Sequence, residues 1–277
     1  RIRRLTTEGN VEFYSGTIGG GDVVNGIGTE AVFAATNRSM ADSKGNLFVT
    51  DNRSIRKITP NGTVTYLAYN SSGNPYDIHI DKNDVIYFTD VTSNGFSIRM
   101  FDPNGSPNAK ILAGSGTGSV DGTGSSASFD GPYGITLNSE GDLLVTDSRN
   151  NRIRRVTTEG EVTTFTGSAE GYRDGDISEA LFNFPFAITN DGDAGNIYVA
   201  DKGNNRIRKI SASGEVSTLA GNGEEGFSDG TGQEASFTSL EDITIDDQDN
   251  LWVIDDNLIR KIAQDGTVIT VSRSSDK

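Results

Sequence analysis

The chain has 277 residues, of which 34% are hydrophobic, and its 24 basic and 39 acidic side chains give a formal charge of −15. A field of that sign repels a phosphate backbone, and no apolar run is long enough to cross a bilayer, so we expect neither a nucleic-acid partner nor membrane insertion by this segment. Because cysteine is absent, disulfides, thiolate catalysis and zinc–sulfur sites are excluded as well.

One short pattern recurs along the chain at intervals of 43 to 55 residues. It is an Ile-Arg pair followed by a turn and a β-rich run, and its copies begin at Ile2, Ile55, Ile98, Ile153, Ile207 and Ile259. The stretch "DKGNNRIRKISASG" at 201–214 is typical. Glycine turns between β-branched residues predict one hairpin per copy.

A second strand pair precedes each copy except the first. An example is "GITLNSEGDLLVTD", and the five pairs end at Asp51, Asp90, Asp147, Asp201 and Asp255. Each period therefore holds two hairpins in series and shows no helical periodicity. Four antiparallel strands repeated at this spacing are typical of a β-propeller, in which each small sheet is one blade.

The stretch "GNIYVADKGNNRIRKISASGEVSTLAG" at 195–221 resembles an NHL repeat, and similar matches cover nearly the whole chain. The resemblance implies an all-β, six-bladed propeller of four-stranded antiparallel blades. Members of this family include RNA binders, protein–protein modules, extracellular sensor domains and an amidating lyase, so the fold does not identify the function.

We therefore predict a single propeller domain over residues 1–277, in which one blade lacks its inner two strands. Segment 2–16 would be the outer hairpin of that incomplete blade, and an upstream segment would supply its inner strands. The full blades are predicted at 38–69, 76–114, 133–167, 186–221 and 241–272.

The repeated charged residues are expected to be structural. The second residue of each copy is an arginine, and both faces of a propeller sheet are covered by neighbouring blades, so each guanidinium needs a carboxylate partner. The aspartate at the preceding strand end can take that role and also accept turn N–H groups. The equivalent arginines are Arg3, Arg56, Arg99, Arg154, Arg208 and Arg260.

The loops between blades also share a pattern, Asp or Asn followed by Gly and then by Ala-x-Phe. The phenylalanines are predicted to plug the seams between blades, and the polar residues to start turns. Calcium is kept as an alternative because the loops are acidic, although they lack the ligand spacing of an EF-hand. The residues concerned are Phe33, Phe129, Phe182 and Phe237, and Asn25, Asp121, Asp174 and Asp229.

A binding site is expected where the blades differ from one another. At the start of the inner strand, three blades carry an aromatic residue. At the next position three blades carry a charged residue, whereas the other two carry the small, uncharged Gly134 and Ala187. Rings beside carboxylates suit carbohydrate stacking or a basic peptide, although they could also only cover the loop base. The predicted ligand-binding residues are Arg38, Tyr76, Asp77, Tyr133, Phe186 and Asp242.

Catalysis has weaker support in the sequence. His79 is the only histidine and is expected to be packed and hydrogen-bonded, whereas the amidating-lyase branch of the family uses several metal-binding histidines. No catalytic residue or cofactor is predicted. Asp77 and Asp242 still leave open a carboxylate pair for hydrolysis, so a hydrolase or lyase with a divalent cation at the channel mouth is the alternative.

The leading hypothesis is a non-catalytic, extracellular recognition or assembly module that binds a protein or glycan. Asn-x-Ser/Thr sites that lie early in the chain favour secretion and are candidate glycosylation sites, although a similar number is expected by chance. They are Asn37, Asn52, Asn61, Asn70 and Asn104.

Overall fold

The computed structural model describes residues 1–6, 10–18, 23–67, 73–92, 95–103 and 108–273. In these residues the fold is all-β, and six 3-10 turns of three residues each are its helical elements. None of its helices is long and apolar enough to cross a membrane. The chain divides into two compact units, Arg1–Leu112 and Ala113–Lys277.

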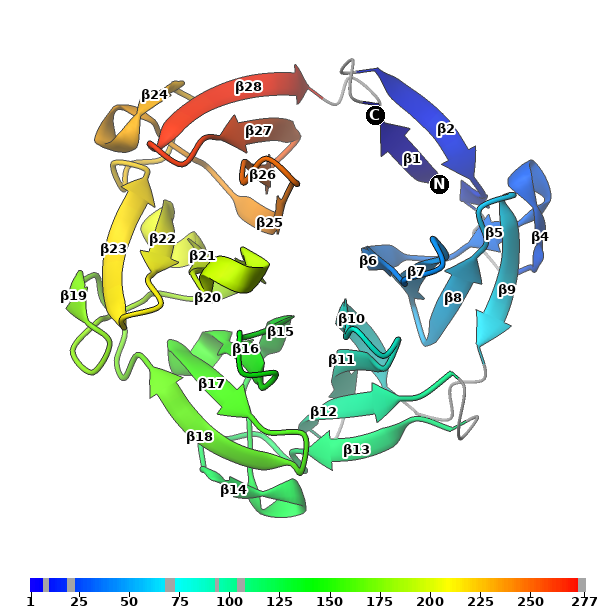
Figure 1. The fold of residues 1–277 in the computed structure, drawn as a ribbon, viewed down its shortest axis with the longest axis horizontal. Coiled ribbons are helices and arrows are strands. Elements are labelled where there is room, and N and C mark those ends of the chain that lie inside the picture. The colour runs from blue at the N-terminus through cyan, green and yellow to red at the C-terminus, as the bar shows by residue number, and fades with distance from the viewer. Residues whose placement is uncertain (7–9, 19–22, 68–72, 93–94, 104–107, 274–277) are drawn as a thin grey trace. The chain divides into compact units, whose positions relative to one another are not determined.

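The first unit contains two full antiparallel blades (Figure 1). Blade 1 consists of β6 (Thr36–Ala41), β7 (Leu47–Asp51), β8 (Ser54–Ile58) and β9 (Thr63–Leu67), with the short strand β4 (Gly26–Ile27) on its outer edge. Blade 2 consists of β10 (Asn74–Ile80), β11 (Ile86–Thr92), β12 (Gly95–Phe101) and β13 (Lys110–Ala113). Two smaller sheets are formed by β1 (Ile2–Leu5) with β2 (Val11–Ser15), and by β3 (Thr17–Ile18) with β5 (Val32–Phe33).

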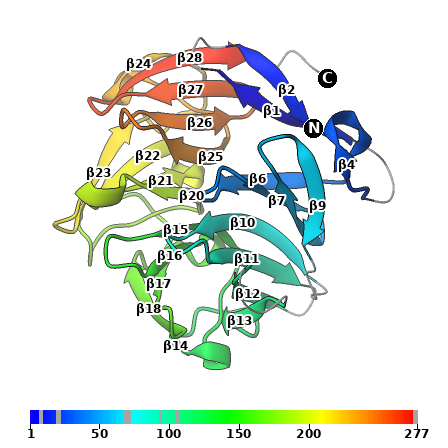
Figure 2. The ribbon, with the colours of Figure 1, turned by 45° about the vertical axis from the view of Figure 1, so that its right-hand side comes forward.

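The second unit contains three blades, and in each of them the four long strands follow one another in chain order (Figures 1 and 2). Blade 3 consists of β15 (Pro132–Leu137), β16 (Leu143–Asp147), β17 (Arg152–Val156) and β18 (Glu161–Thr166), with β14 (Gly122–Thr123) outside β18. Blade 4 consists of β20 (Pro185–Asn190), β21 (Ile197–Asp201), β22 (Arg206–Ile210) and β23 (Glu215–Ala220), with β19 (Gly175–Asp176) outside β23. Blade 5 consists of β25 (Leu240–Ile245), β26 (Leu251–Asp255), β27 (Leu258–Ile262) and β28 (Thr267–Arg273), with β24 (Gly230–Thr231) outside β28.

The predicted count of six blades is wrong, because the described residues form five. The Ile-Arg copy that begins at Ile2 forms only the two-stranded sheet β1–β2, to which no other described strand pairs. Four of these five blades also have one strand more than the four that were predicted. There a loop segment before the blade adds a fifth short strand, as where Gly175 of β19 pairs with Val216 of β23.

Buried arginine–aspartate pairs join the strands of every blade, as the repeats predict. Nη1 of Arg208 donates to Oδ2 of Asp201 at 2.8 Å, and both side chains are fully buried. The other oxygen of Asp201 accepts the backbone N–H of Asn183 at 2.8 Å, so the carboxylate also fixes the preceding loop. The equivalent pairs are Arg56–Asp51, Arg99–Asp90, Arg154–Asp147 and Arg260–Asp255.

The loops before the blades bind the same guanidinium groups. Nη2 of Arg208 donates to Asp174 at 2.6 Å, and the Arg208 guanidinium carbon lies 4.9 Å from the ring centroid of the buried Phe182. Asp174 also accepts the backbone N–H and the hydroxyl of Thr218. The loop aspartates and phenylalanines thus fasten and cover an arginine, a role beyond the predicted turns and seam plugs. The same arrangement holds for Arg56 with Asn25 and Phe33, Arg154 with Asp121 and Phe129, and Arg260 with Asp229 and Phe237.

Apolar side chains fill the seams between neighbouring blades. In the second unit, Leu144 and Ile153 of blade 3 pack with Ile188 and Ile197 of blade 4. In the first unit, Phe48 of blade 1 packs into the corresponding seam with blade 2. This packing places the first strands β15 and β20 next to one another, and those strands carry the candidate site.

Candidate recognition surface

The structure places the predicted site residues on the first strands of the blades. In the first unit, the guanidinium carbon of Arg38 on β6 lies 5.6 Å from the ring centroid of Tyr76 on β10, which is a cation–π distance. Oδ1 of Asp77 accepts the N–H of the next residue at 2.8 Å. Arg38 and Tyr76 therefore come together as a cation–aromatic pair within this unit.

In the second unit, the predicted rings of blades 3 and 4 are in direct contact. The ring centroids of Tyr133 on β15 and Phe186 on β20 are 4.9 Å apart, with the planes tilted by 41°. Tyr133 is partly exposed, whereas Phe186 is buried with 6% of its surface accessible. Phe186 thus forms the buried base of this contact, and Tyr133 is the ring that reaches solvent.

Phe184 is a third ring of this cluster and was not among the predicted site residues. Its centroid lies 6.0 Å from those of both Tyr133 and Phe186, and it is nearly parallel to Phe186. The three residues Tyr133, Phe184 and Phe186 are called the aromatic surface below. Because Phe184 is partly exposed, two rings of this surface reach solvent.

Phe184 adopts a backbone conformation that is costly for a bulky residue. Its φ is +50°, in the left-handed region, and its N–H donates to Oδ1 of Asn151 at 2.8 Å. The equivalent residue of blade 3 is Gly131, with φ +72°, which takes this conformation without a steric cost. A phenylalanine here costs about 1–2 kcal/mol. The signal was visible in the sequence, where "FDGPYG" in one blade becomes "FNFPFA" in the next.

Two ion pairs flank the aromatic surface. Nζ of Lys202 lies 4.6 Å from the Phe186 ring centroid and 2.5 Å from a carboxylate oxygen of Glu241. On the other side, Arg149 approaches Asp130 at 3.3 Å and the Tyr133 hydroxyl at 3.4 Å. The rings are therefore bordered by both signs of charge.

Gly134 has a structural role that was not predicted from the sequence. A β-carbon at this position would lie 2.7 Å from the carbonyl oxygen of Phe186 and 3.1 Å from the α-carbon of Ala187. The absence of a side chain lets β15 and β20 approach, and this approach brings Tyr133 against Phe186.

The remaining candidates are Asp242 of blade 5 and the histidine of blade 2, which lie in different units. Oδ1 of Asp242 accepts the N–H of the next residue at 2.9 Å. Burial lowers the pKa of His79 from 6.5 to about 4, with Asp81 opposing the shift, so His79 is neutral at pH 7. Within the described ranges, no group of three or more His, Cys, Asp or Glu side chains could hold a metal ion.

The candidate glycosylation sites are only partly covered by the structure. Asn37, Asn52 and Asn61 are exposed. Asn70 and Asn104 lie outside the described residues. Glycosylation at all five asparagines stays a prediction.

Comparison with known proteins gives related sequences. Residues 129–156 match the family model of the NHL repeat. NHL repeat-containing protein 2 of Gallus gallus is 32% identical over 135 residues, which cover 44% of this chain and 18% of that protein. The protein SUPPRESSOR OF QUENCHING 1, chloroplastic, of Arabidopsis thaliana is 39% identical over 167 residues, which cover 54% and 16%. This chain thus spans less than a fifth of the length of these curated relatives.

Solved structures with low sequence identity share the fold. A streptogramin B lyase has a TM-score of 0.60 at 19% identity, with 99% of this chain and 76% of that chain covered. A chain of the nidogen/laminin complex has a TM-score of 0.60 at 18% identity, with 83% and 76% covered. A gluconolactonase from Xanthomonas campestris has a TM-score of 0.56 at 14% identity, with 79% and 69% covered.

These neighbours include two enzymes and a protein complex, so the shared fold does not decide between catalysis and binding. The resemblance to NHL-repeat proteins seen in the sequence is confirmed by the matched repeat at 129–156 and by the NHL repeat-containing relative, and the fold is an all-β propeller.

Proposed function

We propose that the chain is a non-catalytic recognition module that binds a protein or glycan partner through the aromatic surface of blades 3 and 4. The observation that carries this proposal is the left-handed backbone of Phe184 at a position where blade 3 has a glycine. Backbone strain of this kind gathers at ligand-binding sites, because the side chain it presents is needed there.

The aromatic surface suits a partner that presents an apolar face. Tyr133 and Phe184 are partly exposed above the buried Phe186, so two rings are offered on a fixed base. Rings of this kind stack on the carbon face of a sugar or enclose an apolar side chain, and they lose little conformational entropy on binding.

The flanking ion pairs would give the site its orientation. Glu241 and Lys202 stand on one side, and Arg149 and Asp130 on the other, so a polar group on the partner can meet either charge. In blade 5, Asp242 is proposed to contribute to the same recognition. In the first unit, the Arg38–Tyr76 pair with the adjacent Asp77 is proposed as a further contact point. An extracellular setting is part of this proposal.

The proposal is tested by finding the partner and then removing the rings one at a time. A glycan array and affinity capture identify candidates, and calorimetry measures their affinity. Tyr133→Ala and Phe184→Gly should each weaken binding by about 1–3 kcal/mol, the usual scale for an anchor residue. Phe184→Gly should leave the melting temperature nearly unchanged, because the loss of ring packing is offset by relief of the backbone strain.

Phe227→Ala is the matched control. Phe227 lies in the same unit, exposes 47% of its surface and is not part of the aromatic surface, so its removal should not change affinity. Intact affinity together with a large fall in melting temperature for Tyr133→Ala would show that the rings only cover the loop base. Recovery of the partner in a chemically altered form would instead favour the hydrolase or lyase alternative.

A further inference from the structure

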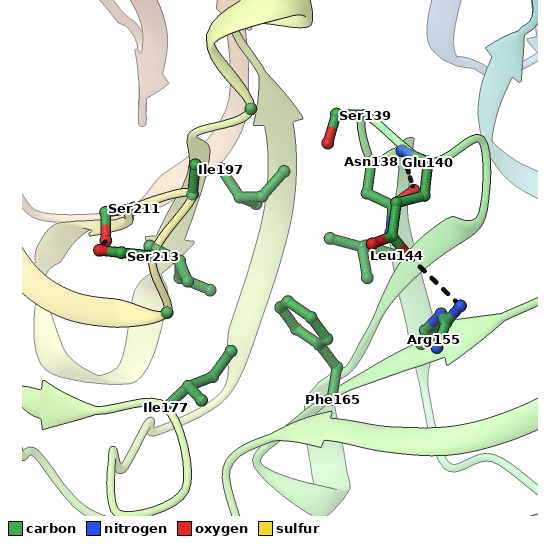
Figure 3. Close-up of a pocket in the computed structure, with 14 residues that line it drawn as sticks. Asn138, Ser139, Glu140, Leu144, Arg155, Phe165, Ile177, Ile197, Ser211 and Ser213 are labelled. Carbon is green, nitrogen blue, oxygen red and sulfur yellow. Dashed lines mark hydrogen bonds and ion pairs between the residues drawn. The ribbon is translucent and has the colours of Figure 1, made fainter.

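A cavity opens between blades 3 and 4 (Figure 3). Its volume is about 340 Å³, and because Asn138 at its rim follows the last residue of β15, it lies at the opposite end of that strand from Tyr133. Leu144 and Phe165 of blade 3 face Ile197 of blade 4 across it, and Ser139 and Ser211 stand on its two sides. The walls are thus apolar and the rim polar. The volume lies at the lower end of the range for small-molecule sites, and a cavity of roughly 150 Å³ already holds benzene.

The cavity exists because blade 3 lacks an aromatic side chain that the other four blades have. The second residue of the second strand is Leu144 in blade 3, whereas the other blades carry Phe48, Tyr87, Tyr198 and Trp252 there. In the seam between blades 1 and 2, the ring of Phe48 is part of the packed core. A leucine reaches less far, so space is left in front of it.

The cation that accompanies the missing ring is still present. In three blades the residue paired with the aromatic across the strands is a lysine, whose Nζ lies 5.5 to 5.8 Å from the ring centroid. Arg155 pairs with Leu144 in the same register and lines the cavity. Residues paired in this way project from the same face of a sheet. A ring that continued Leu144 toward blade 4 would therefore come within reach of the Arg155 guanidinium.

The neighbouring seam shows what occupies the equivalent space. Between blades 4 and 5, the buried Tyr198 donates its hydroxyl to Oε1 of Gln264 at 2.8 Å and lies 3.4 Å from Asp191. Burial raises the pKa of Tyr198 to about 12, so this phenol stays protonated and remains a donor. The seam is thus bridged by a phenol that is anchored on the turn of the next blade.

Both ends of this bridge are missing in the seam between blades 3 and 4. Leu144 replaces Tyr198, and Ala212, which lines the cavity, replaces Gln264. Asn138, also at the cavity, stands where blade 4 has Asp191, and its Oδ1 accepts the N–H groups of Glu140 and Asp142. The space of a phenol ring and of its anchoring amide is therefore open from the rim to the apolar floor.

We propose that this cavity is a binding site for a small uncharged phenol, which takes the place that a tyrosine side chain fills in the next seam. The ring would lie against Leu144 and Phe165, near Arg155, with its hydroxyl toward the turn that contains Ala212. An uncharged ligand fits best, because Arg155 is already paired with Asp142 and Glu140 at the rim. This site is separate from the aromatic surface, so it stands or falls independently of the proposed function.

The probe for the test is 4-ethylphenol, with binding followed by ligand-observed NMR and calorimetry on the whole chain. We expect saturable binding that is weaker for 4-ethylcyclohexanol, which has no aromatic ring, and for 4-hydroxybenzoate, which carries a charge. Leu144→Trp places the side chain of blade 5 in the cavity. It should weaken binding at least tenfold and raise the melting temperature of the free protein.

Ala212→Gln provides a test that does not alter the core, since position 212 is in an exposed turn. The new amide should accept the phenol hydroxyl as Gln264 does for Tyr198, and should tighten 4-ethylphenol binding about three- to tenfold, the value of one hydrogen bond. Binding of 4-ethylanisole, which has no hydroxyl, should not change. The exposed Ala169→Gln is the control and should have no effect.

Three results would overturn the proposal. They are the absence of saturable 4-ethylphenol binding by the unaltered chain, unchanged affinity in a folded Leu144→Trp variant, and equal affinity for 4-ethylphenol and 4-ethylcyclohexanol. If Leu144→Trp does not fold, Ala212→Gln decides, and an affinity gain confined to the phenol supports the site.

Discussion

Arg208 and Asp201 form an ion pair of 2.8 Å in which neither side chain is accessible to solvent. Arg208 also donates to the carbonyl oxygens of Leu181 and Arg173, so its guanidinium joins two strands to the preceding loop. Removing one member of a buried pair leaves the other charge without compensation. Arg208→Ala should therefore lower the free energy of unfolding by about 3–5 kcal/mol, measured by urea denaturation.

An exposed pair of the same length is the control. Arg4 and Glu12 approach to 2.8 Å, but 62% and 48% of their side-chain surfaces are accessible, so solvent screens the interaction. Arg4→Ala should change stability far less than Arg208→Ala. Similar effects of the two substitutions would contradict a structural role for the buried arginines.

The pH dependence of stability should also change in Arg208→Ala. Burial raises the pKa of Asp201 from 3.8 to about 6, and Arg208 is the largest of the opposing influences. The folded state thus holds this proton more tightly than the unfolded chain, so the contribution of Asp201 to stability falls as pH rises from about 4 to 6 and is constant above. Without Arg208 the pKa rises further and the decline continues above pH 6.

The stability difference between the unaltered chain and Arg208→Ala should therefore widen from pH 6 to pH 8 in urea denaturation. In Arg4→Ala, where no buried carboxylate loses its partner, the difference should be the same at both values. A constant difference for Arg208→Ala would show that Asp201 does not respond to the guanidinium.

His79 should have the opposite effect on pH dependence. Its pKa is about 4 in the folded chain and 6.5 when unfolded, because burial disfavours the charged ring. Stability from this group is present above pH 6.5 and is lost as the pH falls to about 4, since only the unfolded chain takes up the proton. His79→Gln should reduce the loss in this window by up to about 3 kcal/mol.

The measurement is the free energy of unfolding at pH 4.5 and pH 7.5 for both proteins. Asp201 and the other carboxylates are common to both, so their effects cancel in the comparison. An unchanged dependence in His79→Gln would mean that the imidazole is solvated in the folded chain.

Gly134→Ala should destabilise the second unit by about 1–3 kcal/mol, since the added carbon meets the backbone of β20 and cannot be accommodated by a side-chain movement. Gly116→Ala is the control, because a β-carbon there meets nothing within 4 Å. Thermal melting distinguishes them. Equal melting temperatures would show that β15 and β20 can separate without cost.

The sequence predicted well what depends on local chemistry. The strand pairs and the partnership of Arg208 with Asp201 follow from turn residues and from a repeat that places both in every blade. The short strand β19 could not be predicted in this way, because its partner Val216 is about forty residues away and its own sequence is a loop pattern. The sixth blade was counted from a local motif, although a blade requires strands that the described chain does not provide.

The candidate site also combines features that the local sequence predicts with features that it does not. Tyr133 and Phe186 were found because they occupy one position in successive repeats, and their contact depends on Gly134. Phe184 was not predicted, because its importance lies in its backbone φ angle. Aligning the blades shows that Leu144 stands where the other blades have an aromatic residue. The cavity also requires Ala212, which a different blade contributes.

The loop that precedes a blade is stabilised by contacts with that blade. The stability of a shortened or broken chain therefore depends on whether the break keeps the loop attached. Residues 173–181 are held by Arg208 and by the pairing of β19 with β23, both within blade 4. An excised fragment that begins at Pro185 would keep the four long strands but lose these contacts, and one that begins near Ser168 would keep them. A chain break at 168–169 should therefore destabilise the second unit less than a break at 183–184, although both breaks avoid the long strands.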